Sequence, residues 1–252
     1  MSGEAKRAAA RQRIAAERAA EAAAAAAAAR RRRTVLGGVV AAVVLVVVLV
    51  AVVVVQTMRT STSADAAAPA NTSGNGYVVT VGQADAPVIL DVYEDFQCPN
   101  CKALEDSTGS TIDDLVTAGT VQVRYHGMAF LDTDANDDYS TRALNAAAVV
   151  ADTAGTEAYE RFHDLLFAHQ PAEGGSGLTD DQLVGYAEQA GATGAGVAAD
   201  VRDLVFADWV EGAEDQASKD GVTGTPTVLV DGEELTDLSP AGLTAAVAAA
   251  QQ

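Results

Sequence analysis

A run of 21 uncharged and almost wholly apolar residues, 35–55, constrains this 252-residue chain more than any other feature. As a helix, the run is long enough to cross the roughly 30 Å of hydrocarbon in a bilayer. Valine is a poor helix former in water, but in lipid the backbone must satisfy its own hydrogen bonds, so a helix is the expected state. The sequence therefore predicts a single transmembrane helix at residues 34–55.

Charge is distributed very differently on the two sides of this run. Residues 1–33 carry nine Lys and Arg against three Glu, and from Thr34 onward seven basic residues accompany 32 acidic ones, giving net charges of +6 and −25. Basic residues stay on the cytoplasmic side, and four consecutive arginines at 30–33 precede the run, so we expect a cytoplasmic N-terminus and an extracytoplasmic C-terminal part. The acidic C-terminal part argues against nucleic-acid binding, because it would repel phosphate.

The alternative to an anchor is a cleaved secretory signal. Such a signal has an apolar core of about 7–15 residues with the cleavage site close behind it, whereas the Ala-Asp-Ala candidate at 64–66 lies well beyond residue 55. An uncleaved anchor is therefore favoured. The Ala-rich segment 1–33 is expected to be a cytoplasmic basic tail that sets the topology, in preference to a membrane-surface or partner-binding helix. Residues 56–76, which are rich in Ser, Thr and Asn without hydrophobic periodicity, are expected to be a flexible linker.

Residues 77–252 are long enough for one domain with its own core. Their pattern predicts strands at 78–81, 87–93, 120–125, 227–230 and 233–236, and helices at 102–119, 139–154, 156–169, 179–190, 197–217 (with possible breaks) and 240–250. Residues 94–97 are expected to form a loop, and the first helix is expected to break near Gly109 and to close at Gly119. The order of elements predicts an α/β fold with a helical insertion at about 132–210.

Cys98 and Cys101, the only cysteines of the chain, lie where a predicted strand meets a predicted helix. The thiolate is the reactive form of cysteine, and the N-terminus of a helix stabilises it through partial positive charge and unpaired N–H groups. We therefore expect Cys98 to be an exposed nucleophile, and Cys101 lies one turn further along, within reach of a disulfide with it. The spacing predicts a redox pair.

Other interpretations of the cysteine pair are weaker. A structural disulfide over so short a loop contributes little entropic stabilisation. A zinc site normally needs a second pair of ligands, and His126, His163 and His169 show no ligand spacing, so they are interpreted as ordinary surface or core histidines.

A second motif, Thr225-Pro226, stands directly before the predicted strand 227–230. Proline there removes a donor from the sheet, which makes sense if the Thr225–Pro226 bond is cis and the loop packs against the cysteine pair. An ordinary proline turn is the equally weighted alternative from these residues alone.

Together these motifs resemble the thioredoxin superfamily, and the helical insertion makes the chain similar to its DsbA-like branch, of the membrane-anchored actinobacterial type. The segments that carry the resemblance are 91–101, 139–147, 162–175, 178–191 and 221–232. The resemblance implies a thioredoxin fold, with Cys98 as nucleophile, Cys101 as resolving cysteine, and a cis Pro226 after Thr225 in a substrate-binding loop.

Two positions depart from the DsbA pattern. The dipeptide between the cysteines is Pro99-Asn100, where DsbA has His as the second residue, so weaker stabilisation of the thiolate and a weaker oxidant are expected. Relatives often carry a buried acid six residues before the first cysteine, where this chain has Val92. Glu94 or Asp95 is a candidate to replace it.

The resemblance implies an extracytoplasmic thiol–disulfide oxidoreductase that introduces disulfides into secreted or cell-envelope proteins through Cys98 and Cys101. It implies unfolded or secreted protein thiols as substrates and a quinone-linked membrane partner of the DsbB or vitamin K epoxide reductase-like type. Flavin, haem and metal are not expected. The alternatives are a reductase or isomerase of the same fold and a non-enzymatic tethered binding module.

Overall fold

The computed structural model describes residues 67–73 and 77–252. Its elements, in chain order, are β1 (Thr72–Ser73), β2 (Val78–Val81), β3 (Val88–Asp95), α2 (Pro99–Thr117), β4 (Val121–Met128), α3 (Tyr139–Ala154), α4 (Thr156–Ala168), α5 (Asp180–Ala190), α6 (Val197–Arg202), α7 (Ala207–Lys219), β5 (Thr227–Val230), β6 (Glu233–Glu234) and α8 (Pro240–Ala250). The predicted α/β pattern is therefore present in the described residues.

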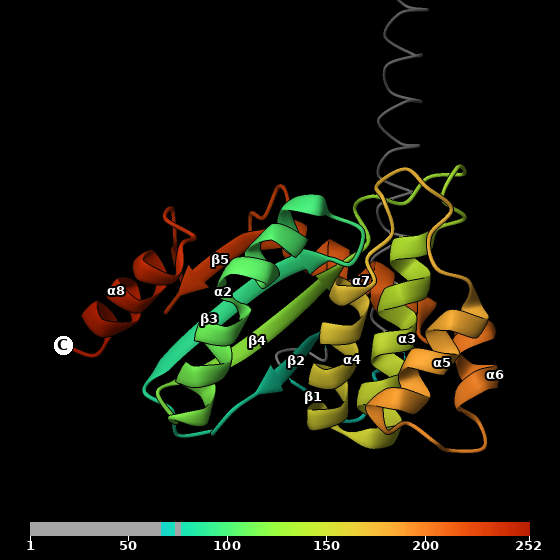
Figure 1. Ribbon diagram of the computed structural model, residues 1–252, viewed down its shortest axis with the longest axis horizontal. Coiled ribbons are helices and arrows are strands. Elements are labelled where there is room, and N and C mark those ends of the chain that lie inside the picture. Colours follow the sequence, from blue (N-terminus) through green and yellow to red (C-terminus); the bar gives the residue numbers. More distant parts are fainter. Residues whose placement is uncertain (1–66, 74–76) are drawn as a thin grey trace, which may run out of the picture. The chain divides into compact units, whose positions relative to one another are not determined.

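The strands form one sheet in the order β1-β2-β4-β3-β5-β6 (Figure 1). β3 and β4 are parallel, with Val88 opposite Val121, and every other neighbouring pair is antiparallel. β3 lies between β4 and β5, and all of its residues except Ile89 are buried, as expected for a central strand that is covered on both faces. The C-terminal end of β3 leads directly to the cysteine pair.

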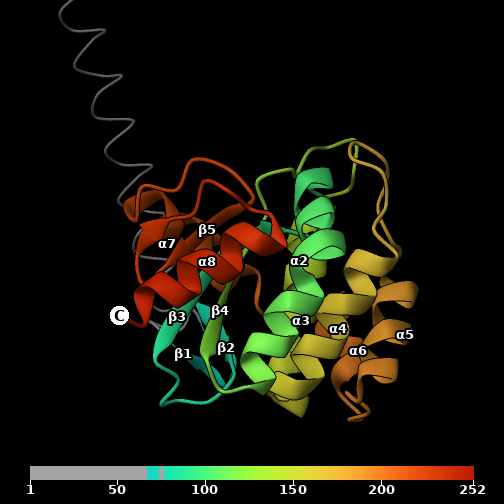
Figure 2. The ribbon, with the colours of Figure 1, turned by 60° about the vertical axis from the view of Figure 1, so that its left-hand side comes forward.

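Helices cover both faces of the sheet (Figures 1 and 2). α2 and α8 pack on one face, where Leu104 and Leu243 meet Leu90 of β3 and Val228 of β5. α7 packs on the opposite face, onto β4. This arrangement follows from the alternation of β3, in which Leu90 points toward α2 and the next residue points toward α7.

The remaining helices, α3 to α6, pack on one another beside the sheet (Figure 2). α3 is the buried centre of this group, because its run of alanines lets α4, α5, α6 and α7 approach closely. The predicted helix 197–217 is in fact two helices, α6 and α7, and Leu204 between them has a positive φ of 51°. The predicted insertion boundary at 210 falls inside α7, which belongs with the sheet.

Three predicted boundaries are corrected by the structure. β3 extends to Asp95, so Glu94 and Asp95 are strand residues and not part of a loop. α2 continues without a break through Gly109, whose missing side chain leaves room for the carboxylate of Glu105, and it is followed by Gly119 with φ of +69°. β6 is shorter than expected and ends at Glu234, although the amide of Leu235 still donates to the carbonyl of Val228 in the register of the β5–β6 pair.

The end of the predicted linker 56–76 is also corrected. Thr72 and Ser73 form β1, which pairs antiparallel with β2, and the side-chain amide of Asn71 donates to the carbonyl of Ala151 at 2.9 Å. The sequence did not predict β1, because two residues are too few to show the alternation of a strand. Its pairing with β2 is visible only in the structure.

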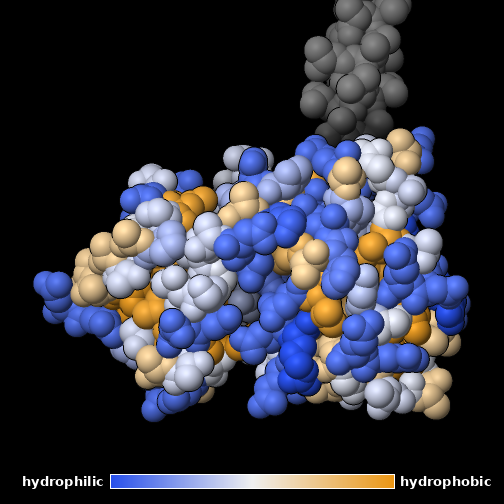
Figure 3. Space-filling view, viewed as in Figure 1, coloured by the Kyte–Doolittle hydropathy of each residue, from blue (hydrophilic) through white to orange (hydrophobic). Residues whose placement is uncertain are grey.

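Among residues 67–73 and 77–252, no helix is both long enough and apolar enough to cross a bilayer. The predicted basic tail at 1–33 and the predicted transmembrane helix at 34–55 lie outside the described residues. On the face drawn in Figure 3, hydrophilic residues predominate and apolar residues form small scattered groups.

Candidate active site

The two cysteines begin helix α2. Cys98 is the N-cap residue with an extended backbone, and Pro99 follows at the first helical position, where its missing N–H costs nothing. The amide of Cys98 donates to the carbonyl of Asp95 at 3.0 Å, and the amide of Lys102 donates to the carbonyl of Cys98 at 3.1 Å. Neither sulfur is in a disulfide, so both side chains are thiols.

The two thiols are placed differently. Cys98 is 5% exposed, which corrects the expectation of an exposed nucleophile, and it lines a cleft with a volume of about 420 Å³. The other residues that line this cleft are Pro99, Asn100, Phe130, Leu131, Glu173, Thr223, Gly224 and Thr225. Cys101 is 2% exposed, and its burial raises the pKa of its thiol, an effect to which the nearby Cys98 and Glu94 add. A partner in the cleft can therefore reach Cys98, whereas Cys101 is held protonated beneath it.

The proline loop faces the first cysteine. The Thr225–Pro226 bond is cis, as the resemblance implies, and β5 begins at the next residue. The thiol of Cys98 lies 3.5 Å from the carbonyl oxygen of Thr225, to which it donates. Of the predicted site residues, Cys98, Pro99, Asn100 and Thr225 thus meet at the cleft, although more than 120 residues separate the two motifs in the sequence.

A buried polar frame supports this arrangement. Asp95 accepts hydrogen bonds from the amide of Gln97 at 2.8 Å, the hydroxyl of Ser140 at 2.7 Å and the amide of Leu131 at 3.1 Å. Burial raises the pKa of Asp95 to about 6, although these three donors oppose the rise. The side-chain amide of Asn136 donates to Gln97 at 2.6 Å. Asp95 therefore holds the turn before Cys98 and the segment after β4 in place.

The loop 169–179, between α4 and α5, forms another wall of the cleft. The side-chain amide of Gln170 donates to the carbonyl of Cys98 at 2.9 Å, and Glu173 lines the cleft itself. Gln97 donates to two backbone carbonyls of the same loop at 3.1 and 3.3 Å. The helical part of the molecule thus contacts the cysteine pair directly.

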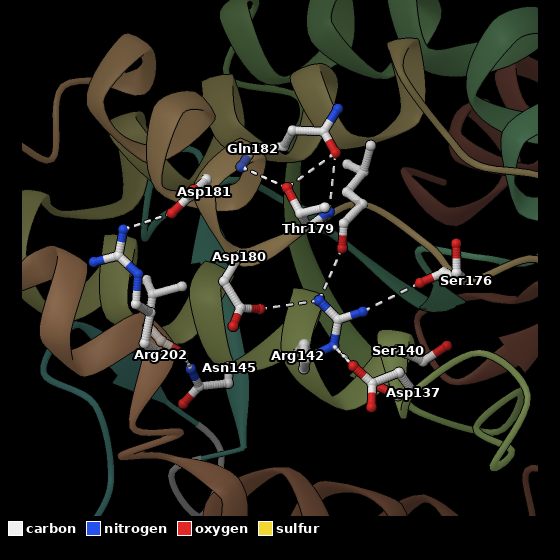
Figure 4. Close-up of polar contacts among 12 residues, drawn as sticks. Asp137, Ser140, Arg142, Asn145, Ser176, Thr179, Asp180, Asp181, Gln182 and Arg202 are labelled. Carbon is white, nitrogen blue, oxygen red and sulfur yellow. Dashed lines mark hydrogen bonds and ion pairs between the residues drawn. The ribbon is translucent and has the colours of Figure 1, made fainter.

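Arg142 of α3 holds this loop at its far end (Figure 4). Its guanidinium donates to the carbonyls of Leu178 at 2.8 Å and Ser176 at 3.3 Å, and to the carboxylate of Asp180 at 3.0 Å. It also donates to the carbonyl of Asp137, so all of these bonds converge on one rigid, planar group. The loop is therefore held at one end by Arg142 and at the other by the hydrogen bonds of Gln97 and Gln170 near Cys98.

Both candidates for the missing acid, Glu94 and Asp95, are buried, but they contact different partners. Glu94 is buried on the same face of the sheet as α2, and its Oε1 lies 2.8 Å from Nε2 of His163 on α4. His163, predicted to be an ordinary histidine, is 1% exposed. The sequence could not reveal this contact, because the two residues are 69 positions apart on different elements.

A thioredoxin family model matches residues 74–249. Among solved structures, the reduced disulfide bond oxidoreductase DsbG of Mycobacterium tuberculosis is 34% identical, with a TM-score of 0.63 over 69% of this chain and 87% of that chain. Oxidised DsbA of the same organism is 34% identical, with a TM-score of 0.62 over 69% and 92%. The thiol-disulfide oxidoreductase MdbA of Corynebacterium diphtheriae is 27% identical, with a TM-score of 0.58 over 69% and 89%.

The chain also resembles short parts of two longer curated proteins. The serine/threonine-protein kinase PknE of Mycobacterium tuberculosis is 36% identical over 118 residues, which are 45% of this chain and 21% of that protein. The Na(+)/H(+) antiporter NhaA 1 of Salinispora arenicola is 30% identical over 151 residues, which are 60% of this chain and 21% of that protein. The match thus covers about a fifth of each of these longer proteins.

Proposed function

The chain belongs to the thioredoxin family and is DsbA-like, and from this premise we propose that it introduces disulfides into extracytoplasmic proteins by thiol–disulfide exchange. The observation that carries this proposal is the placement of Cys98 at the N-terminus of α2, in a cleft, 3.5 Å from the carbonyl of Thr225 before a cis proline. The names of the similar solved structures, which are disulfide oxidoreductases from actinobacteria, support it further.

In the proposed reaction, a substrate thiolate attacks Cys98 of the oxidised Cys98–Cys101 pair. A mixed disulfide forms between substrate and Cys98, and the sulfur of Cys101 leaves with the electron pair and takes up a proton. A second substrate thiolate then attacks the substrate sulfur, so that the substrate leaves as a disulfide and both cysteines become thiols. The extended substrate backbone would bind along the Thr225–Pro226 loop, whose residue Thr225 lines the same cleft as Cys98.

The raised pKa of Cys101 suits the direction of this reaction. A buried thiol that favours its protonated form is a poor nucleophile, so Cys101 does not readily expel the substrate from the mixed disulfide. The uncharged Asn100 beside Cys98 has no cationic group with which to stabilise the thiolate, and we therefore expect a weaker oxidant than DsbA.

Location and recycling complete the proposal. The apolar run at 34–55 and the arginines before it would anchor the chain with its N-terminus in the cytoplasm and the described residues outside. Reoxidation of the pair needs an electron acceptor, for which a quinone-linked membrane protein of the DsbB or vitamin K epoxide reductase-like type is the proposed partner. The proposed site uses the Cys98–Cys101 disulfide itself and needs no other cofactor.

The reduction potential of the cysteine pair tests the direction of exchange. Equilibration of the full chain with glutathione buffers should give a value nearer to the about −120 mV of DsbA than to the about −270 mV of thioredoxin. A value near that of thioredoxin would contradict the oxidase proposal and favour a reductase.

A trapping variant tests whether the site acts on proteins at all. In Cys101→Ala, the mixed disulfide with Cys98 has no resolving thiol on the same chain, so substrates should accumulate as adducts that reductant releases. Cys98→Ala is the matched control and should form none. Absence of adducts from Cys101→Ala, in cells whose secreted proteins contain disulfides, would favour a non-enzymatic module.

A further inference from the structure

The cleft beside Cys98 contains a charged side chain that the exchange reaction described above does not use. Of the described residues that line this cleft, Glu173 is the only acidic one and none is basic. Its side chain is exposed. The volume of about 420 Å³ lies within the range of about 300–1,000 Å³ that is usual for ligand pockets, so the cleft has room for a short extended segment. A substrate segment that approaches Cys98 therefore meets one carboxylate.

The backbone around Glu173 is held in place by a buried side chain. Glu173 stands in the tight turn 172–175, whose ends are joined by an amide-to-carbonyl hydrogen bond of 3.0 Å. Gly174 has a φ of +73°, a conformation that favours glycine. The side-chain amide of Gln97 donates to the carbonyls at both ends of this turn, at 3.3 and 3.1 Å. Since Gln97 is fully buried and directly precedes Cys98, it fixes the turn that carries the carboxylate against the segment that carries the nucleophile.

An exposed aromatic ring lines the same cleft. Phe130 is 39% exposed, and among the described residues only Val205 is another large apolar residue with this degree of exposure. The loops that follow β4 and α4, which carry Phe130 and Glu173, lie at the end of the molecule where α2 begins (Figures 1 and 2). A carboxylate can bind two N–H groups of a guanidinium, and an aromatic face can stack on its plane. The cleft thus offers both of the groups that arginine recognises.

The charges near the cleft also favour a basic substrate segment. Residues 132–138, which follow the apolar wall of the cleft, contain four Asp and no basic residue. Lys102, which follows the cysteines on α2, is paired with Asp106 of the same helix at 2.8 Å. The net charge from Thr34 onward is −25, so the field of the whole domain attracts basic segments and repels acidic ones.

We propose that the cleft selects substrate cysteines that have an arginine two residues away in an extended segment, a preference that rests on the proposed function. Side chains two residues apart point to the same side of an extended chain, so the arginine enters the cleft together with the substrate cysteine. Its guanidinium binds the carboxylate of Glu173 and stacks on Phe130 while the substrate sulfur attacks Cys98. The two residues determine specificity through the rate of this first attack, and the sulfur chemistry is unchanged.

Short peptides with a single cysteine measure this preference. The oxidised full chain is mixed with an excess of peptide, the reaction is stopped with acid, and intact mass gives the rate at which the mixed disulfide forms. The peptides are acetylated and amidated, and they differ only two residues before or after the cysteine, where they carry arginine, its uncharged analogue citrulline, lysine or glutamate. A nearby charge also changes the pKa of the peptide thiol, so each rate is divided by that of the same peptide with the uncharged hydroxyethyl disulfide.

We expect the normalised rate to be about fivefold higher with arginine than with citrulline, because an exposed ion pair and a cation–π contact each contribute a few-fold. Lysine should lie between these two, and glutamate below citrulline. Glu173→Gln should bring the ratio of arginine to citrulline to about one, and Glu173→Lys should make glutamate faster than citrulline. Phe130→Leu should make arginine and lysine equal. Glu188→Gln is the matched control, because it removes an exposed carboxylate of α5 that does not line the cleft, and its ratios should match the wild type.

Three outcomes would overturn the preference or its assignment. Equal rates with arginine and citrulline in the wild type would show that the cleft does not read charge. A wild-type ratio in Glu173→Gln, or an equal fall in Glu188→Gln, would show that the preference follows the net charge of the domain and not Glu173. If arginine stays faster than lysine in Phe130→Leu, the ring has no part in it. A wild type that forms no mixed disulfide with any of the four peptides would instead contradict the proposed function.

Discussion

Glu105 shows how burial of one carboxyl makes the stability of this fold depend on pH. It lies on α2 beside His163, and burial raises its pKa to about 7, although the charge of His163 opposes the rise. Since the folded pKa lies above the ordinary value, the folded state binds this proton more tightly than the unfolded chain does. Ionised Glu105 therefore destabilises the fold, and stability falls as the pH rises from about 4.5 through 7.

We predict that Glu105→Gln stabilises the protein at pH 8 by about 2 kcal/mol and has little effect at pH 4. The shift of the pKa from 4.5 to about 7 corresponds to about 3.5 kcal/mol, and solvent around the partly exposed side chain reduces this value. Urea unfolding at pH 4, 6 and 8 would measure this difference. Asp106→Asn is a matched control on the next residue, where the exposed pair with Lys102 should contribute less than about 1 kcal/mol at any of these pH values. Equal stabilisation of Glu105→Gln at pH 4 and pH 8 would contradict the argument.

The sequence predicted only those site residues that a local motif identifies without knowledge of the fold. Cys98 and Cys101 are recognisable from their spacing, and Thr225-Pro226 from its place before a strand. Gln97 and Asn136 were missed, since amides are common on surfaces and only the fold brings these two together and buries them. The same holds for His163, because no local pattern shows that it faces Glu94.

At the scale of elements, Asn145 ties α3 to the turn between α6 and α7 (Figure 4). Its amide donates to the carbonyls of Val201 at 3.1 Å and Asp200 at 3.4 Å, and its carbonyl accepts from the amide of Phe206 at 2.9 Å. The side chain is fully buried, so no water is at hand to replace these bonds. The break that separates α6 from α7 thus has its polar backbone groups satisfied from α3.

We predict that Asn145→Ala destabilises the protein by about 3 kcal/mol, because each buried group left unpaired costs about 1–3 kcal/mol. Chemical denaturation monitored by circular dichroism would measure the loss. Asp181→Ala, which removes an exposed contact from α5 to Arg202 of α6 at 2.8 Å, should change stability by less than about 1 kcal/mol. If the two variants lose the same amount, the buried bonds of Asn145 have no special role.

Elements were predictable where the local pattern and the tertiary environment agree. α3, α5, β5 and α8 begin and end close to the expected residues, because Thr179 and Ser239 cap α5 and α8, and Pro240 marks the start of α8. β3 was predicted too short, since Glu94 and Asp95 are charged residues that the fold buries against His163 of α4 and Ser140 of α3. Helix α2 was predicted to break at Gly109, but packing of the whole helix outweighs the low propensity of one glycine.

At the scale of the whole molecule, the charge distribution and the burial of the cysteines constrain where the protein can work. The strongly acidic C-terminal part and the basic segment before the apolar run belong to opposite sides of a membrane in the proposed arrangement. The two cysteines then lie outside, where disulfides persist. Cys98 lines an open cleft and Cys101 is buried, so only one of them is accessible to a reagent in solution.

This difference makes the topology testable with a small, membrane-impermeant maleimide, which forms a thioether with Cys98 that Cys101 cannot displace. After reduction of intact cells with an impermeant phosphine, we expect the full chain to be labelled once, at Cys98, and alkaline carbonate to leave it in the membrane fraction. Cys98→Ser should lose the label although Cys101 remains, because burial shields that thiol from the reagent. Labelling that appears only after lysis would place the site in the cytoplasm, where glutathione keeps thiols reduced, and would remove the basis for an oxidase. Release by carbonate, with labelling unchanged, would instead refute the anchor alone.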